Sequence, residues 1–360
     1  MLLACGAGVR ALDAQAIRTT LLGAGSREPV AGAFVVVTDT MGREITRTLT
    51  DEIGRVRIDL APGAYRLLVL RIGVARWRTP AFSLVAGDTM TAPIQAPETP
   101  VLLSEIAVRA DRRCRLQPEE GSAAATLWEE ARKALEATEW TIAHPVYRFQ
   151  ARRYVRVFGP AGDRISEERR ETAGYSTWPF VSLAAESLAA GGFAQKDSLG
   201  VMTYYGPDLP VLLSETFLAR HCFRVQRASG ELQYSRIGLG FEPVGGRGHV
   251  DIAGVLWLDQ RSSELRELEF HYTNLGWWAG SGATGLVVFE RLPNRAWAIR
   301  RWSIRMPIPR VGRKSLMPGV MAPTAVIDTL GVAGYREEGG LVTVVLSASG
   351  RPVAAYPDEP

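Results

Sequence analysis

The chain has 360 residues, a length that corresponds to two or three domains of about 150 residues each. Hydrophobic residues make up 46% and charged residues 22%, which excludes a disordered or fibrous chain. The formal net charge is +4, but the 42 basic residues are interspersed with 38 acidic ones and accompany no recognition motif for DNA or RNA, so we expect no nucleic-acid partner. We also expect no transmembrane segment, because no window approaches about 18 uninterrupted apolar residues.

Residues 1–16 are predicted to be the remnant of a signal peptide. Ala14-Gln15-Ala16 has the small residues that a signal peptidase recognises, so the mature chain is expected to begin near Ile17. No basic segment precedes this site, which a start codon placed too far downstream would explain. Two alternatives remain open: Cys5 in the sequence LLAC is lipidated, as in a bacterial lipoprotein, or the N-terminus is an irregular cytosolic segment.

Two cysteines, Cys114 and Cys222, remain after such a cleavage. An even number is typical of chains exported to an oxidising compartment, and we therefore predict a disulfide between them. Closing a loop of roughly 100 residues stabilises a fold by about 4–5 kcal/mol in the chain-entropy model. The alternative is two separate buried thiols.

The first domain, residues 17–98, is predicted to be a β-sandwich. Short β-rich runs alternate there with proline, glycine and aspartate turns, at the spacing typical of that architecture. The seven predicted strands are residues 18–22, 33–38, 44–49, 56–60, 64–71, 81–85 and 89–94.

Three motifs in this domain resemble the carboxypeptidase regulatory-like family: PVAGA at 29–33, TDEIGRV at 50–56 and PGAYRL at 62–67. The family has the patterns P-V-x-G-A, T-D-x-x-G-x-[FV] and P-G-x-Y-x-L in this order, usually with an aromatic residue where Val56 stands. The resemblance implies a seven-stranded prealbumin-like sandwich, an accessory module without catalytic residues. Residues 103–110 resemble the segment that follows this module in TonB-dependent receptors, but we predict an edge strand that leads into a linker over residues 99–111.

The second domain, residues 112–350 before a tail at 351–360, is predicted to be α+β, with a curved, mostly antiparallel sheet and a few helices. A helix opens it, with Glu129 and Lys133 on its polar side. The apolar stripe of this helix comprises Leu127, Trp128, Ala131, Ala134, Leu135 and Thr138. The predicted strands are 147–157, 237–241, 255–258, 268–272, 286–290, 297–306 and 341–346, and short helices are predicted at 183–188 and 211–219. The chain as a whole is therefore predicted to be mainly β.

Residues 251–270 read as an apolar strand, an Asp-containing turn and a return strand, and resemble the half-barrel of periplasmic lipoprotein carriers. Any antiparallel hairpin of a curved sheet could have the same pattern. The resemblance implies an apolar cavity between the sheet and its helices, which would cradle acyl chains. The residues expected to line it are Tyr147, Phe149, Val155, Ile237, Leu239, Phe241, Leu268, Phe270 and Tyr272.

Motifs for catalysis, metal binding and cofactor binding are absent from the sequence. The four histidines lack metal-ligand spacing, and no serine-hydrolase elbow, P-loop or dinucleotide fingerprint occurs. We therefore predict no catalytic residue, no metal and no cofactor.

Two features are candidates for ligand contacts. Trp277 and Trp278 lie in the glycine-rich segment 274–282, where aromatic rings at a rim contact ligands or one ring folds back over the sheet. Arg153 interrupts an apolar strand face, where it contacts a ligand or forms a buried ion pair with a glutamate of a neighbouring strand.

These features favour an exported protein of the bacterial envelope, periplasmic or associated with the outer membrane. Its expected function is non-catalytic binding of an envelope lipid, glycan or protein partner. One alternative is a structural interaction module that docks on an outer-membrane assembly, and the other is a hydrolase with an unrecognised site.

Overall fold

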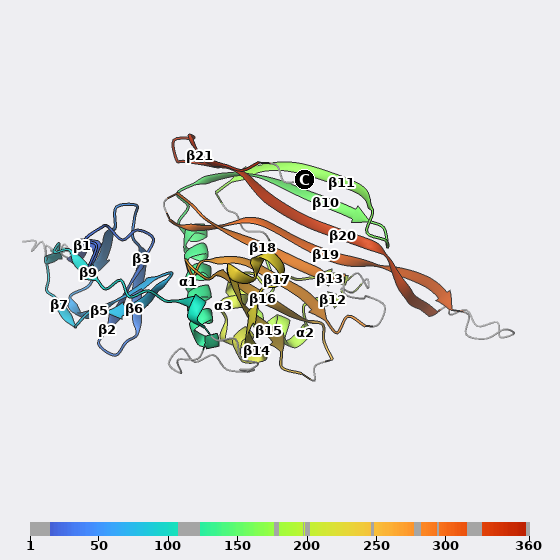
Figure 1. The fold of residues 1–360 in the computed structure, drawn as a ribbon, viewed down its shortest axis with the longest axis horizontal. Helices are drawn as coiled ribbons and strands as arrows, with labels where there is room; N and C mark the ends of the chain where they lie inside the picture. The colour runs from blue at the N-terminus through green and yellow to red at the C-terminus, as the bar shows by residue number, and fades with distance from the viewer. Residues whose placement is uncertain are drawn as a thin grey trace, which may run out of the picture. The chain divides into compact units, whose positions relative to one another are not determined.

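A computed structural model describes residues 15–106, 123–175, 180–196, 198, 202–245, 248–276, 282–293, 295–314 and 326–357, with the backbone alone over 311–314 and 326–330. The chain divides into two compact units, Met1–Val101 and Leu102–Pro360 (Figure 1). The N-terminal residues 1–14, which include Cys5, lie outside the described residues. Among the described helices, none combines the length and apolar character needed to cross a membrane.

The first unit is a β-sandwich of two sheets, as predicted. One sheet has the order β4-β1-β8 with β9 also pairing to β1, and the other has the order β3-β2-β5-β6 with β7 pairing to β5. The strands are β1 (Gln15–Gly23), β2 (Phe34–Asp39), β3 (Glu44–Leu49), β4 (Arg55–Leu60), β5 (Gly63–Arg71), β6 (Val74–Arg78), β7 (Phe82–Leu84), β8 (Thr89–Met90) and β9 (Ile94–Ala96).

The core of the sandwich follows from alternation along its strands. In β4, Val56, Ile58 and Leu60 are buried while the residues between them are exposed, so Val56 fills a core position of the family pattern. The predicted strand at 89–94 is instead two short strands, because Pro93 cannot donate a ladder hydrogen bond.

The second unit contains a ten-stranded sheet in which every pairing is antiparallel. Its order is β11-β10-β20-β19-β18-β17-β16-β15-β14, with β21 pairing to β20. Its strands are β10 (Arg148–Phe158), β11 (Arg164–Gly174), β14 (His221–Arg227), β15 (Arg236–Pro243), β16 (Asp251–Asp259), β17 (Leu265–Thr273), β18 (Thr284–Arg291), β19 (Trp297–Lys314), β20 (Val326–Leu346) and β21 (Pro352–Ala355). A separate two-stranded sheet pairs β12 (Ala194–Lys196) with β13 (Met202–Tyr204).

Helices pack on one face of the large sheet. The predicted first helix is α1 (Ala123–Ala143), which crosses that face and places the Trp128 ring 6.4 Å from the Phe223 ring of β14 (Figure 1). The other helices are η1 (Leu103–Glu105), α2 (Ala185–Gly191), α3 (Leu209–Leu213), α4 (Glu215–Arg220) and η3 (Gly230–Tyr234).

Two helix predictions need correction. The single helix expected at 211–219 is divided into α3 and α4, because the hydroxyl of Ser214 accepts the Phe217 N–H and starts a new helix. Lys133, expected on the polar side of α1, is only 2% exposed, and its ammonium donates to Glu130 at 2.7 Å. Its buried charge is therefore neutralised by an ion pair with Glu130 on the same helix.

Candidate functional site

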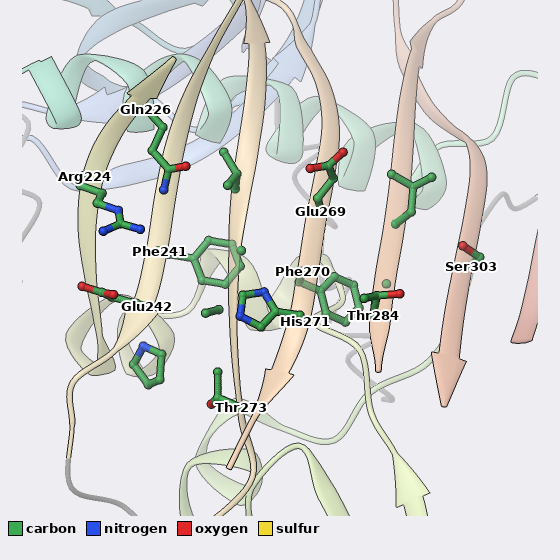
Figure 2. A pocket seen from close by; sticks show the side chains of 16 residues that line it. Arg224, Gln226, Phe241, Glu242, Glu269, Phe270, His271, Thr273, Thr284 and Ser303 are labelled. Atoms are coloured by element: carbon green, nitrogen blue, oxygen red, sulfur yellow. The ribbon is translucent and has the colours of Figure 1, made fainter. Parts of the chain in front are cut away.

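The face of the large sheet opposite α1 is called the open face here. Strand alternation assigns Arg224 of β14, Val255 of β16, Glu269 of β17 and Ser303 of β19 to one cross-strand row of this face. Helices α1, α3 and α4 pack on the other face, against residues such as Phe223, Phe241 and Leu268. In Figure 2, α1 lies behind the strands whose side chains are drawn.

A hollow of about 780 Å³ lies on the open face across β14–β19. This volume is within the roughly 300–1,000 Å³ typical of ligand sites. The hollow is lined by Arg224, Gln226, Phe241, Glu242, Pro243, Ala253, Gly254, Val255, Glu269, Phe270, His271, Thr273, Thr284, Gly285, Leu286 and Ser303 (Figure 2). We call it the open-face hollow.

Most polar side chains of the open-face hollow have no partner among the residues that the structure describes. Within the described part of the chain, no side-chain hydrogen bond or ion pair satisfies Arg224, Gln226, His271, Thr284 or Ser303; each of them lines the hollow. The hydroxyl of Thr273 is buried and also lacks a partner among the described residues. Arg224, His271 and Thr284 are exposed and Gln226 and Ser303 are half-buried, so their polar groups are open to water and could exchange water for a ligand.

Trp257 lies next to the hollow on the open face. Its indole N–H donates to Glu269 Oε2 at 3.0 Å. A Cβ at Gly238, its register partner on β15, would lie only 2.7 Å from the indole, so the ring covers that glycine. The indole is thus held in place at one edge and remains only half-buried.

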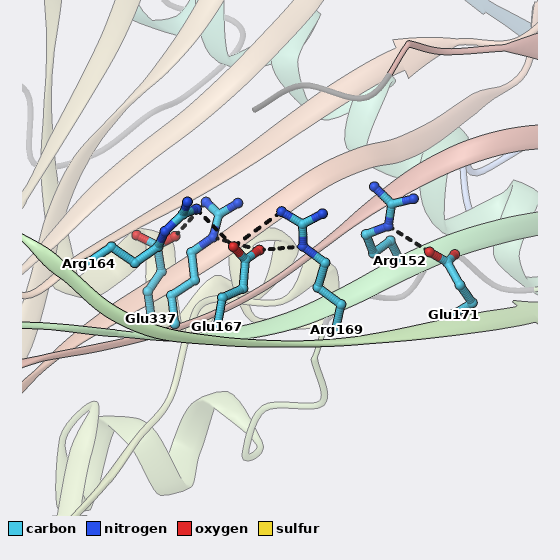
Figure 3. Close-up of polar contacts among 7 residues, drawn as sticks. Arg152, Arg164, Glu167, Arg169, Glu171 and Glu337 are labelled. Atoms are coloured by element: carbon cyan, nitrogen blue, oxygen red, sulfur yellow. Dashed lines mark hydrogen bonds and ion pairs between the residues drawn. The ribbon is translucent and has the colours of Figure 1, made fainter.

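Ion pairs cover the open face at the other end of the sheet. Glu167 of β11 accepts from Arg156 at 3.2 Å and from Arg164 and Arg169 at 2.8 Å (Figure 3). Arg156 also lies 3.7 Å from Glu337 of β20. Hydrogen bonding by Arg169, with a further contribution from Arg156, lowers the pKa of Glu167 to about 2.

A second pair, Arg152 and Glu171 at 2.6 Å, extends this group along β10 and β11 (Figure 3). We call the whole group the arginine network. It comprises Arg152, Arg156, Arg164, Arg169, Glu167, Glu171 and Glu337.

Only one of the predicted ligand contacts lies within the described residues. Arg153 is exposed rather than buried, and its guanidinium carbon lies 5.6 Å from the centre of the Trp302 ring. The apolar stretch around it lies at the margin of the sheet, where Arg153 reaches solvent. Trp277 and Trp278 lie outside the described residues, as does Cys114. Cys222 is buried in β14.

The predicted acyl-chain cavity is not found between the described residues of the sheet and helices. Two hollows on that side have volumes of only about 10 and 20 Å³, far below the size of a ligand site. Tyr147 and Phe149 belong to a separate cluster with Leu292 and Val345. The apolar faces therefore form a filled core in this part of the chain.

His221 connects a helix to the sheet on the helix side. Its ring nitrogens lie 2.9 Å from the Phe217 carbonyl and 3.2 Å from the Ile252 carbonyl, and its Nε2 is 3.4 Å from Asp251 Oδ1. The ring is buried and stacks on Phe217. His221 therefore links α4 to β16 by its ring nitrogens. The described residues contain no group of three or more metal-ligating side chains.

Comparison with known families identifies the first unit. Residues 16–96 match the model of the carboxypeptidase regulatory-like domain, which confirms the resemblance seen in the three motifs. This domain is a non-catalytic accessory fold. No curated protein matches the chain.

Three solved structures show partial similarity. A 5-hydroxyisourate hydrolase of Klebsiella pneumoniae is 17% identical, with 24% of this chain and 86% of that chain covered and a TM-score of 0.19. A DUF3823 family protein of Bacteroides ovatus is 8% identical, with 64% and 91% covered and a TM-score of 0.19. The TIE protein of Bacillus anthracis is 8% identical, with 89% and 49% covered and a TM-score of 0.22.

Proposed function

We propose that the chain is a non-catalytic binding protein of the bacterial envelope, and that its open-face hollow holds a saccharide. The observation that carries this proposal is the set of polar side chains around the hollow that have no partner in the described part of the chain. Arg224, Gln226, His271, Thr284 and Ser303 belong to this set.

The hydrogen-bonding capacity of the hollow suits a ligand with many hydroxyl groups. A sugar hydroxyl both donates and accepts, and the hollow offers both kinds of partner. Arg224 supplies donors, Glu242 supplies acceptors, and Thr284 and Ser303 can act as either. A ligand that satisfies these groups would be preferred over an analogue that leaves them unpaired.

Trp257 adds an apolar contact beside these polar groups. Its indole is fixed by Gly238 and Glu269, so a ligand would meet a ring that is already in position. Aromatic side chains contribute large apolar area at binding sites, while the N–H of tryptophan is satisfied elsewhere. The faces of a sugar ring have C–H groups that can pack on such a surface.

An acyl lipid fits this site less well. The helix side is packed where the structure describes it, and the open-face hollow has charged residues such as Arg224 and Glu269. Burying an acyl chain against these groups would remove them from water without providing hydrogen bonds in return.

The envelope location is supported by the sequence. The signal-peptidase site before Ile17 and the pair Cys114 and Cys222 both favour export, and the accessory fold of residues 16–96 favours a non-catalytic function. The structural interaction module remains the alternative outcome of the test below.

A glycan array that carries bacterial envelope polysaccharides tests the proposal. We expect the full chain to bind a subset of these glycans, and Trp257→Ala to lose most of that binding. Trp140→Ala is the matched control, because Trp140 lies on α1 and stacks on His144 away from the open face. Absence of glycan binding by the unmodified chain, or equal binding by all three proteins, would contradict the proposal.

A further inference from the structure

Arg305 of β19 lies against two aromatic rings on the open face. Its guanidinium carbon is 4.8 Å from the centre of the Phe158 ring and 4.4 Å from the centre of the Tyr335 ring. Phe158 and Tyr335 are register partners on β10 and β20. Contact with two rings restricts the rotation of the guanidinium.

Within the described ranges, the charge of Arg305 is not balanced by a carboxylate. No ion pair within 4 Å involves it among the described residues, and its Nε is buried without a hydrogen-bond partner. The carboxylate opposite Arg305 in register is Glu337, which is 3.7 Å from Arg156. A buried donor without an acceptor is costly. Because Nε itself is covered, an anionic ligand would have to bind the terminal nitrogens of the guanidinium.

The arginine network increases the positive character around this position. Glu167 already accepts hydrogen bonds from Arg156, Arg164 and Arg169 (Figure 3). With Arg305, the network contains more arginines than glutamates. Each glutamate of the network is already paired with one of its arginines, and the network lies on the same face as Arg305.

Arg305 borders the open-face hollow. Its register partner on β18 is Thr284, and Ser303 lies two residues before it on the same face of β19. Both of these residues line the hollow. The hydroxyl-binding groups of the hollow thus continue directly into Arg305, a cation without a carboxylate partner in the part of the chain that the structure describes.

We propose that the saccharide bound on the open face is acidic, and that Arg305 binds its carboxylate. This inference rests on the proposed glycan function. The planar guanidinium can offer two parallel N–H donors to a carboxylate, which is the geometry that makes arginine selective for such groups. Phe158 and Tyr335 hold the guanidinium plane, and Thr284 and Ser303 lie where the neighbouring hydroxyls of the sugar would reach.

A pair of matched ligands tests this proposal. Acidic bacterial polysaccharides are printed on the array before and after reduction of their uronic acids to neutral sugars. We expect the full chain to bind the acidic forms about ten- to a hundredfold more tightly than the reduced forms, as lost charge-assisted hydrogen bonds imply. Added salt should weaken binding of the acidic forms much more than binding of the reduced forms.

Variants assign this preference to one residue. Arg305→Gln should reduce binding of the acidic forms to the level of the reduced forms, and Arg305→Lys should restore only part of it because lysine lacks the planar fork. Arg170→Gln is the matched control. Arg170 is exposed on β11, and it is the register partner of Arg153 on the other face of the sheet. A thermal unfolding curve for each variant confirms that it is folded, and the salt dependence of the unmodified chain provides a test that needs no variant.

The failure of the two proposals can be distinguished. If the chain binds acidic and reduced forms equally and Trp257→Ala abolishes both, the acidic-ligand inference is wrong while the glycan function stands. If Arg305→Gln keeps the full preference for acidic forms, the assignment to Arg305 is wrong. If the unmodified chain binds neither form, the glycan function and this inference are both overturned.

Discussion

Trp257 and Gly238 are register partners on β16 and β15, and the indole occupies the space that a side chain at residue 238 would need. A glycine in a central strand has no side chain to cover the sheet surface. Here the ring of the neighbouring Trp257 covers that surface instead. It also fixes the ring beside the open-face hollow. Structure and proposed binding therefore depend on the same pair of residues.

Gly238→Ala is expected to lower both the stability of the second unit and its affinity for glycan. The added Cβ would lie 2.6 Å from Val255 Cγ1 and 2.7 Å from the Trp257 ring, so the indole must move. We expect a loss of about 1–3 kcal/mol in the free energy of unfolding and weaker glycan binding. Chemical denaturation and the glycan array measure the two effects. Gly245→Ala is the control, because nothing lies within 4 Å of a Cβ there.

Glu167 should make stability depend on pH. Its pKa in the folded chain is about 2, compared with a usual value of 4.5. A lowered pKa contributes stability above the unfolded value, and this contribution is lost as the pH falls toward the folded value. The difference in the free energy of unfolding between the unmodified chain and Glu167→Gln should therefore be largest above about pH 4.5 and decrease toward pH 2. A difference that is the same at every pH would contradict this account.

Tyr272→Phe is expected to destabilise the second unit. The buried hydroxyl of Tyr272 donates to the Tyr205 carbonyl at 3.0 Å, and its loss leaves that carbonyl without this donor. The expected cost is about 0.5–1.5 kcal/mol, measured by chemical denaturation. Tyr204→Phe is a matched control, because the half-buried Tyr204 contributes its ring to the contact with Tyr272. Equal stability of all three proteins would show that the hydrogen bond contributes nothing.

The predicted disulfide can be tested on protein recovered from an envelope fraction. Digestion without reductant should yield one pair of peptides that joins Cys114 to Cys222, and reduction should lower the melting temperature. The same mass spectrum should show a mature N-terminus near Ile17. Free alkylation of both cysteines before reduction would contradict the disulfide, and intact residues 1–16 on cytosolic protein would contradict export.

The fold could be predicted where one strand face is buried. Ile237, Leu239 and Phe241 alternate with polar or small residues and face the core as expected. The edge strand β11 could not be predicted in this way, because both of its faces are largely exposed and its sequence is mostly charged. In the first unit β6 was also absent from the prediction, since its residues are half-buried or exposed.

The candidate site was harder to predict than the fold. Its polar residues come from several strands and meet only through the pairing register, which a single strand does not specify. One signal was present in β16. Trp257 lies between Leu256 and Leu258, and because side chains alternate along a strand, its ring points to the face away from the core. Arg305 gave no such signal, because Phe158 and Tyr335 are distant from it in the sequence.

Hydroxyl-radical footprinting of the full chain, with and without an envelope polysaccharide selected by the array, tests the central claim most directly. Saccharide binding on the open face predicts lower oxidation of Trp257 and His271, while Trp140 and His144 of the α1 region serve as internal references and stay unchanged. Protection confined to residues 16–96, or unchanged oxidation of Trp257 and His271 at saturating polysaccharide, would contradict the claim that the open face is the binding site.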